Sequence, residues 1–136
     1  MNSLLIAFAF VCLLGLGHAL SLAAHAVCTD RRQSRRTEEK ARALLRSWLT
    51  PQQANQWDTR KEFEVIGSHT GTRYRIRRAT AMNIDELDSR GKVVTQWCFA
   101  PQGELAVGDI MLAQKIALET MEWNALASAN RRVFRP

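Results

Sequence analysis

The first 28 residues of this 136-residue sequence contain no aspartate, glutamate, lysine or arginine. Most of residues 4–27 are apolar, and a helix needs roughly 20 apolar residues to cross the hydrocarbon core of a bilayer. Such a helix satisfies its own backbone hydrogen bonds, which lipid cannot do for it. The absence of charge therefore predicts a transmembrane anchor over residues 1–28 that contacts the lipid bilayer through residues 4–27.

Positive charge is missing before this segment and dense after it. Only Met-Asn-Ser comes first, whereas residues 29–36 form a basic juxtamembrane linker that contains Arg31, Arg32, Arg35 and Arg36. Because cationic segments stay on the cytoplasmic side, the sequence predicts a single-pass protein of the inner (cytoplasmic) membrane with a cytoplasmic domain. The four arginines are candidate contacts for anionic lipid headgroups.

A cleaved signal peptide is the alternative interpretation. Residues 17–19 (Gly-His-Ala) and 24–26 (Ala-His-Ala) resemble the small-x-small pattern of a cleavage site. The missing basic n-region and the arginines just past the cut oppose it. Removal of residues 1–26 would make the domain a periplasmic or secreted protein, in which Cys28 and Cys98 could form a disulfide. A start codon assigned too early is a third interpretation.

The sequence also lacks the spacings that carry familiar site chemistry. Its three cysteines show no CxxC and no Cys/His ligand spacing, so a structural zinc site has no support. Residues 67–71 lack the following lysine and helix of a phosphate-binding P-loop. Asp85, Glu86 and Asp88 lack the ligand pattern of an EF-hand and are interpreted as exposed turn acids. No metal, cofactor or catalytic residue is predicted.

Cys98 and His69 are the residue types of a nucleophile and its base. Sequence spacing does not show whether they meet, and an isolated thiol in apolar surroundings is usually a small buried hydrophobe. A small enzyme that uses Cys98 and His69 is therefore the third of the function hypotheses.

Beyond the linker, the pattern predicts an α+β domain over residues 37–130 and a basic tail over 131–136. Thr37 is expected to cap a first helix. Thr50 and Pro51 are expected to begin a short second helix that ends near Trp57.

Period-two alternation and turn residues predict a small antiparallel sheet of three to four strands. The expected strands cover about residues 62–67, 72–77, 81–84 and 92–99. The first two form a β-hairpin in which Tyr74 and Ile76 face the core.

A long helix that covers the sheet is expected from Asp109, as its N-cap, to about Asn130. Its predicted apolar face consists of Ile110, Leu112, Ala113, Ile116, Ala117, Met121 and Trp123. Helix, then strands, then helix is typical of an α+β fold rather than a parallel α/β sheet.

Arg73, Arg75 and Arg77 alternate along the second expected strand and form a stripe of candidate contacts for an anionic surface. Glu62 and Glu64 occupy the outward face of the partner strand, so cross-strand ion pairs are expected to use part of this charge. A solvated, partly paired face and a ligand-binding surface both remain open. The formal net charge is +6, yet the linker accounts for much of it and nucleic-acid binding is not required.

Between residues 49 and 131 stand several distinctive motifs. They are residues 49–51 (Leu-Thr-Pro), 67–71 (Gly-Ser-His-Thr-Gly), 73–77 (Arg-Tyr-Arg-Ile-Arg), Asn83, 86–88 (Glu-Leu-Asp), 98–101 (Cys-Phe-Ala-Pro) and 108–115 (Gly-Asp-Ile-Met-Leu-Ala-Gln-Lys). In these GSxTGxRYRIR-type and GDxMLAQKIALE-type motifs the chain resembles a family of small bacterial proteins of uncharacterised function. The resemblance implies a shared fold and brings no activity, cofactor or catalytic residue.

Three functions from different classes follow. The first is a membrane-anchored, non-catalytic binding or interaction module with an unidentified protein partner. The second is an exported periplasmic binding or envelope protein formed after signal cleavage. The third is the small enzyme described above.

Overall fold

The structure, a computed structural model, describes residues 31–79 and 81–134. The predicted anchor over residues 1–28 lies outside them, and no helix in the described part is long and apolar enough to cross a bilayer. The chain divides into two compact units, which meet between Thr37 and Glu38.

A helix over residues 31–47 opens the described chain, and its second half belongs to the larger unit. The elements that follow are α2 (Pro51–Arg60), β1 (Glu62–Ile66), β2 (Arg73–Arg77), β3 (Ile84–Leu87), β4 (Val93–Cys98), α3 (Val107–Ala127) and β5 (Asn130–Val133). The α+β class and the long C-terminal helix are thus as the sequence predicts.

The sequence predicts that the first helix begins at Thr37, but in the structure the helix begins earlier. Residues 31–36 are already helical, because arginine and glutamine are good helix formers. The Thr37 hydroxyl instead donates to the Gln33 carbonyl one turn earlier, at 3.0 Å.

The predicted start of α2 is confirmed. Thr50 is the N-cap and Pro51 occupies the first turn. The Thr50 hydroxyl accepts from the Gln53 N–H at 3.3 Å, and the Gln53 side chain accepts from the Thr50 N–H at 3.1 Å. This reciprocal capping box satisfies two orphan donors of the helix.

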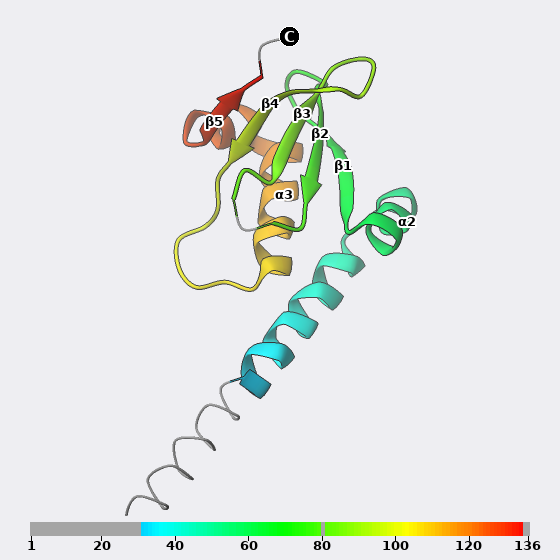
Figure 1. Ribbon diagram of the computed structural model, residues 1–136, viewed down its shortest axis with the longest axis vertical. Helices are drawn as coiled ribbons and strands as arrows, with labels where there is room; N and C mark the ends of the chain where they lie inside the picture. The colour runs from blue at the N-terminus through cyan, green and yellow to red at the C-terminus, as the bar shows by residue number, and fades with distance from the viewer. Residues whose placement is uncertain (1–30, 80, 135–136) are drawn as a thin grey trace, which may run out of the picture. The chain divides into compact units, whose positions relative to one another are not determined.

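All pairings in the sheet are antiparallel, in the order β1-β2-β3-β4-β5 (Figure 1). The β1–β2 hairpin is confirmed, and Tyr74 and Ile76 are buried in the core. The third strand is Ile84–Leu87 rather than 81–84, so Asp85 and Glu86 are strand residues and not turn acids.

A fifth strand, β5, replaces the end of the predicted helix and part of the predicted tail. The helix ends at Ala127, and Asn130–Val133 then pairs with β4. The prediction of three to four strands was wrong because β5 is held by backbone pairing at the sheet edge and shows no alternation of burial.

Helix α3 runs behind the sheet in the view of Figure 1 and contacts β1 and β2. The predicted apolar face was largely wrong, since Ile116, Met121 and Trp123 are exposed. The buried residues are Gly108, Met111, Leu112, Gln114, Lys115, Leu118, Glu122 and Ala125. Polar residues can occupy this face because each finds a partner there.

The N-terminus of α3 is capped from a distance. Asp109 is not the N-cap; Ala106 holds that position and offers no side-chain hydrogen bond. The Glu38 carboxylate accepts from the Val107 N–H at 3.1 Å instead. A Cβ on Gly108 would lie 2.6 Å from the Ala41 carbonyl carbon, so only glycine allows this close approach of the two helices.

Candidate functional site

The most elaborate polar cluster joins the β1–β2 loop to α3. The Glu122 side chain is completely buried, and its carboxylate accepts from the backbone N–H groups of His69 at 2.7 Å and Thr70 at 2.8 Å. It also accepts from the Thr70 hydroxyl at 2.5 Å and the Tyr74 hydroxyl at 2.8 Å. We call this cluster the Glu122 clamp.

Local backbone geometry explains the glycines of the GSHTG loop. A Cβ on Gly67 would overlap the Glu122 carboxylate, and Gly71 adopts φ +69°. The first glycine therefore makes room for the carboxylate, and the second allows a left-handed turn back into β2. The sequence motif is accounted for by the clamp.

Electrostatics keep Glu122 ionised. Burial alone raises the pKa of Glu122, but the hydrogen bonds from Thr70, His69 and Tyr74 outweigh it and hold the pKa below its ordinary value. Burial and the neighbouring carboxylate raise the pKa of Tyr74, which stays neutral. A carboxylate whose oxygens already accept several hydrogen bonds and whose pKa is low is a poor general base. The role of the Glu122 clamp is therefore structural: its hydrogen bonds hold the β1–β2 loop against α3.

His69 lies at the outer edge of the clamp. Its Nδ1 is 2.9 Å from the Ser68 hydroxyl, and its ring centroid lies 6.1 Å from that of Trp123. Cys98 ends β4 at the side of the sheet where β2 ends, whereas His69 precedes β2. The structure therefore places Cys98 and His69 at opposite ends of the sheet. Cys28, which could pair with Cys98 only in the exported alternative, lies outside the described residues.

The arginine stripe on β2 is paired with acids from both neighbouring strands. Arg75 approaches Glu62 at 3.7 Å and Glu64 at 3.5 Å, and Arg73 reaches Glu64 at 4.0 Å. The expected cross-strand ion pairs are present. Its net charge is small, because each arginine of the stripe has an acid within 4.0 Å.

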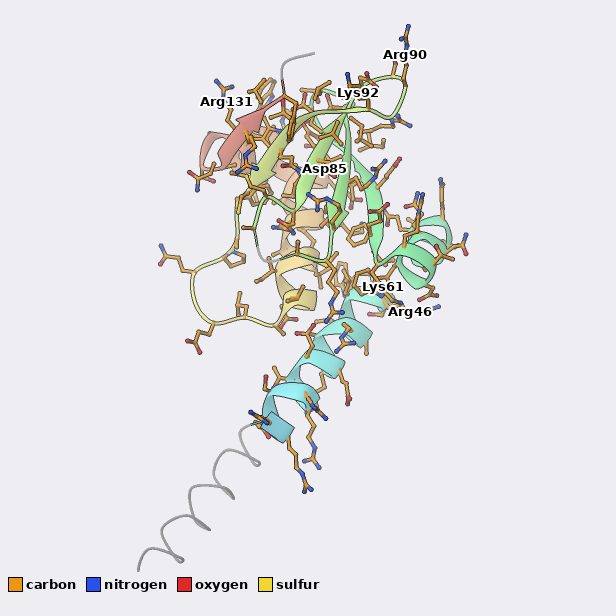
Figure 2. The ribbon with its side chains drawn as sticks, in the orientation of Figure 1. Arg46, Lys61, Asp85, Arg90, Lys92 and Arg131 are labelled. Atoms are coloured by element: carbon orange, nitrogen blue, oxygen red, sulfur yellow. The ribbon has the colours of Figure 1, made fainter. Side chains whose placement is uncertain are left out.

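Asp85 is the partner of Arg77 and the residue that sequence reasoning misplaced most. The two Asp85 oxygens accept from Arg77 at 2.7 and 3.0 Å, and Gln96 donates to one of them at 2.8 Å. Asp85 lies mid-strand in the sheet (Figure 2) and is only 3% exposed. Bidentate pairing with arginine is what permits a carboxylate to be buried here.

The four arginines of the predicted linker are all exposed and lie on a helix. Arg31 and Arg35 are four residues apart, as are Arg32 and Arg36, so the four share one side of that helix. Residues 31–37 contain no acidic side chain. We call this the basic helix face.

The described residues also line two hollows. An apolar groove of about 300 Å³ runs along α3 beside Phe99, Pro101 and Met121. A polar cleft of about 480 Å³ lies between α2 and β1, where Glu119 is engaged by Lys115 and Arg73 by Glu64. The Thr50 hydroxyl that also lines the cleft caps α2.

Within the described chain, no group of three or more His, Cys, Asp or Glu side chains could hold a metal ion. No family model, curated protein or solved structure matches this sequence. The function therefore has to be inferred from the geometry of the chain itself.

Proposed function

We propose that this protein is a membrane-tethered, non-catalytic binding module. In this proposal residues 4–27 anchor the chain in the bilayer, and the basic helix face lies against anionic lipid headgroups. The α+β domain, residues 38–134, is then presented on the cytoplasmic side to a protein partner.

The basic helix face is the observation that carries the proposal. Like charges at i,i+4 destabilise an isolated helix by about 0.2–0.5 kcal/mol per pair, and this helix bears two such pairs. Glu38 and Glu39 follow Arg35 by three and four residues on the same helix and offset part of this repulsion. An anionic membrane surface would relieve the repulsion and contribute about 1 kcal/mol per arginine near it. Dense charge next to an apolar segment fits that role.

The internal polar groups support the non-catalytic part of the proposal. The Thr70 and Tyr74 hydroxyls both donate to Glu122, and Asp85 accepts from Arg77 and Gln96. Such groups stabilise the fold because their hydrogen bonds are satisfied. Chemistry at them would first require breaking those bonds.

Hydrogen exchange of the full chain in lipid nanodiscs tests the headgroup contact. We expect amides of residues 31–36 to exchange more slowly in phosphatidylglycerol than in phosphatidylcholine, because bound arginines stabilise the helix. In the variant Arg31→Gln/Arg32→Gln, the difference in exchange rate between the two lipids should become smaller. The matched control Arg131→Gln/Arg132→Gln removes the same charge from β5, and the difference between the two lipids should stay as large as in the wild type.

Equal exchange of residues 31–36 in the two lipids would contradict the headgroup contact. Recovery of a shortened chain from outside the membrane would instead support the exported alternative, in which residues 1–26 are a signal peptide.

A further inference from the structure

The two edges of the sheet differ in whether side chains cover their outward backbone groups. At the β1 edge, helix α2 supplies side chains to the outward backbone groups of Glu64. Gln53 Nε2 donates to the Glu64 carbonyl at 2.8 Å, and Gln56 Oε1 accepts from the Glu64 N–H at 2.9 Å. The middle residue of this edge therefore has no free backbone group for another strand, and α2 covers the edge at that point.

The β5 edge has no such cover in the described chain. The Phe134 N–H donates to the Val94 carbonyl at 3.0 Å, so the antiparallel alternation turns the N–H and C=O groups of Arg131 and Val133 away from β4. All four residues of β5 are exposed. Two residues thus present backbone donors and acceptors to a further strand.

Charge decides what kind of strand fits. Arg131 and Arg132 are adjacent on β5, so antiparallel two-fold pairing with a second copy would set arginine opposite arginine, which is unfavourable. The charge at this edge comes from Arg131 and Arg132; Figure 2 shows Arg131 beside β5, and Arg90 away from it at the tip of the β3–β4 hairpin. The edge therefore favours an acidic partner over a second copy of this chain.

We propose that the β5 edge binds an acidic, extended segment of another protein as a sixth strand of the sheet. The backbone of Arg131 and Val133 supplies the hydrogen bonds, and Arg131 and Arg132 pair with acidic side chains of the incoming strand. The inference rests on the proposed binding role and specifies its site and partner chemistry. It does not depend on the membrane anchor.

A labelled peptide of alternating valine and glutamate, titrated against the full chain in nanodiscs, tests the inference. Val133→Pro removes an N–H that β4 does not use, and proline is tolerated on an edge strand in that position. We expect this variant to weaken binding about tenfold, the equivalent of about one lost hydrogen bond. Val133→Ala is the matched control, because it shortens the same side chain but keeps the N–H, and it should bind more tightly than Val133→Pro.

Charge is separated from strand pairing by two further measurements. Arg131→Gln/Arg132→Gln should weaken binding and reduce its dependence on salt. The same peptide with every backbone amide N-methylated keeps its charge but has no N–H to donate from either edge, and should not bind measurably.

Binding of the N-methylated peptide equal to that of the parent would overturn the inference, since attraction between charges would then suffice. Failure of the wild type to bind the parent peptide would also overturn it. The N-methylated peptide remains decisive if Val133→Pro lowers the melting temperature. Peptide binding and lipid-dependent exchange are measured separately, so either proposal can fail alone.

Discussion

At the scale of single residues, buried carboxylates organise this protein. Glu122 binds two backbone N–H groups and two hydroxyls, and Asp85 binds Arg77 and Gln96. Glu122 lies on the buried face of α3, and Asp85 lies on the sheet face that carries the arginine stripe. Because a buried charge that loses its partners is costly, these positions should be sensitive to changes of a single atom.

Glu122→Gln should destabilise the fold by about 1–3 kcal/mol, because an amide donor would then face the donors that the carboxylate now accepts. The pKa of Glu122 is lowered in the fold, so its contribution is present above the ordinary pKa and is lost as pH falls through the folded pKa. Chemical denaturation at neutral and acidic pH should show a smaller acid-induced loss in the variant. The exposed control Glu104→Gln should leave the free energy of unfolding unchanged at both pH values. If Glu122→Gln lost as much stability on acidification as the wild type, the proposed contribution of ionised Glu122 would be contradicted.

Arg77 and Arg73 of the stripe should contribute differently to the free energy of unfolding. Arg77→Met leaves the buried Asp85 without its charged partner, and we expect a loss of about 3 kcal/mol or more. Arg73→Met removes a half-exposed arginine that lies 4.0 Å from Glu64, and should cost about 1 kcal/mol or less. Urea denaturation of both variants gives the comparison. Equal losses would show that Asp85 does not depend on Arg77.

At the scale of elements, the sequence predicted correctly those helices and strands that are held by contacts between residues close in sequence. The capping residues of α2 and the alternation of β1 and β2 are readable because neighbours in sequence are also partners in space. The strand β3 was displaced because Asp85 and Glu86 have the composition of a turn. In the strand Asp85 bonds Arg77 and Glu86 bonds Trp97, and both partners lie elsewhere in the chain.

The same limit applies to α3 and to the Glu122 clamp. Hydrophobicity pointed to Ile116, Met121 and Trp123, whereas the buried face includes Gln114 and Glu122. A polar residue on a buried face gives no periodic signal when its partners are backbone groups of a distant loop. The motif at residues 67–71 hinted at such a loop through its glycines, but did not identify Glu122.

The contact between α3 and the first helix gives a prediction of unusual sign. Alanine normally stabilises a helix interior relative to glycine by about 1 kcal/mol. Gly108→Ala should instead lower stability by about 1–3 kcal/mol, because overpacking pushes the two helices apart at Ala41. Thermal unfolding measures the change. A higher melting temperature in the variant would contradict the close approach.

At the scale of the whole molecule, the buried polar groups around Glu122 and Asp85 stabilise the fold. The proposed function instead uses exposed groups. The basic helix face and the β5 edge are both exposed and both positively charged, and neither depends on a catalytic group. In the proposal, the first keeps the chain against an anionic surface and the second receives an acidic strand. The contact with the anionic surface depends on which side of the membrane the domain occupies.

Topology is therefore the measurement that tests the account most directly. A reporter active only in the cytoplasm and one active only after export would be fused separately to Pro136, and the size of the chain followed by immunoblotting. The account predicts a full-length, membrane-bound protein with an active cytoplasmic reporter. A shortened protein with only the export reporter active would contradict it.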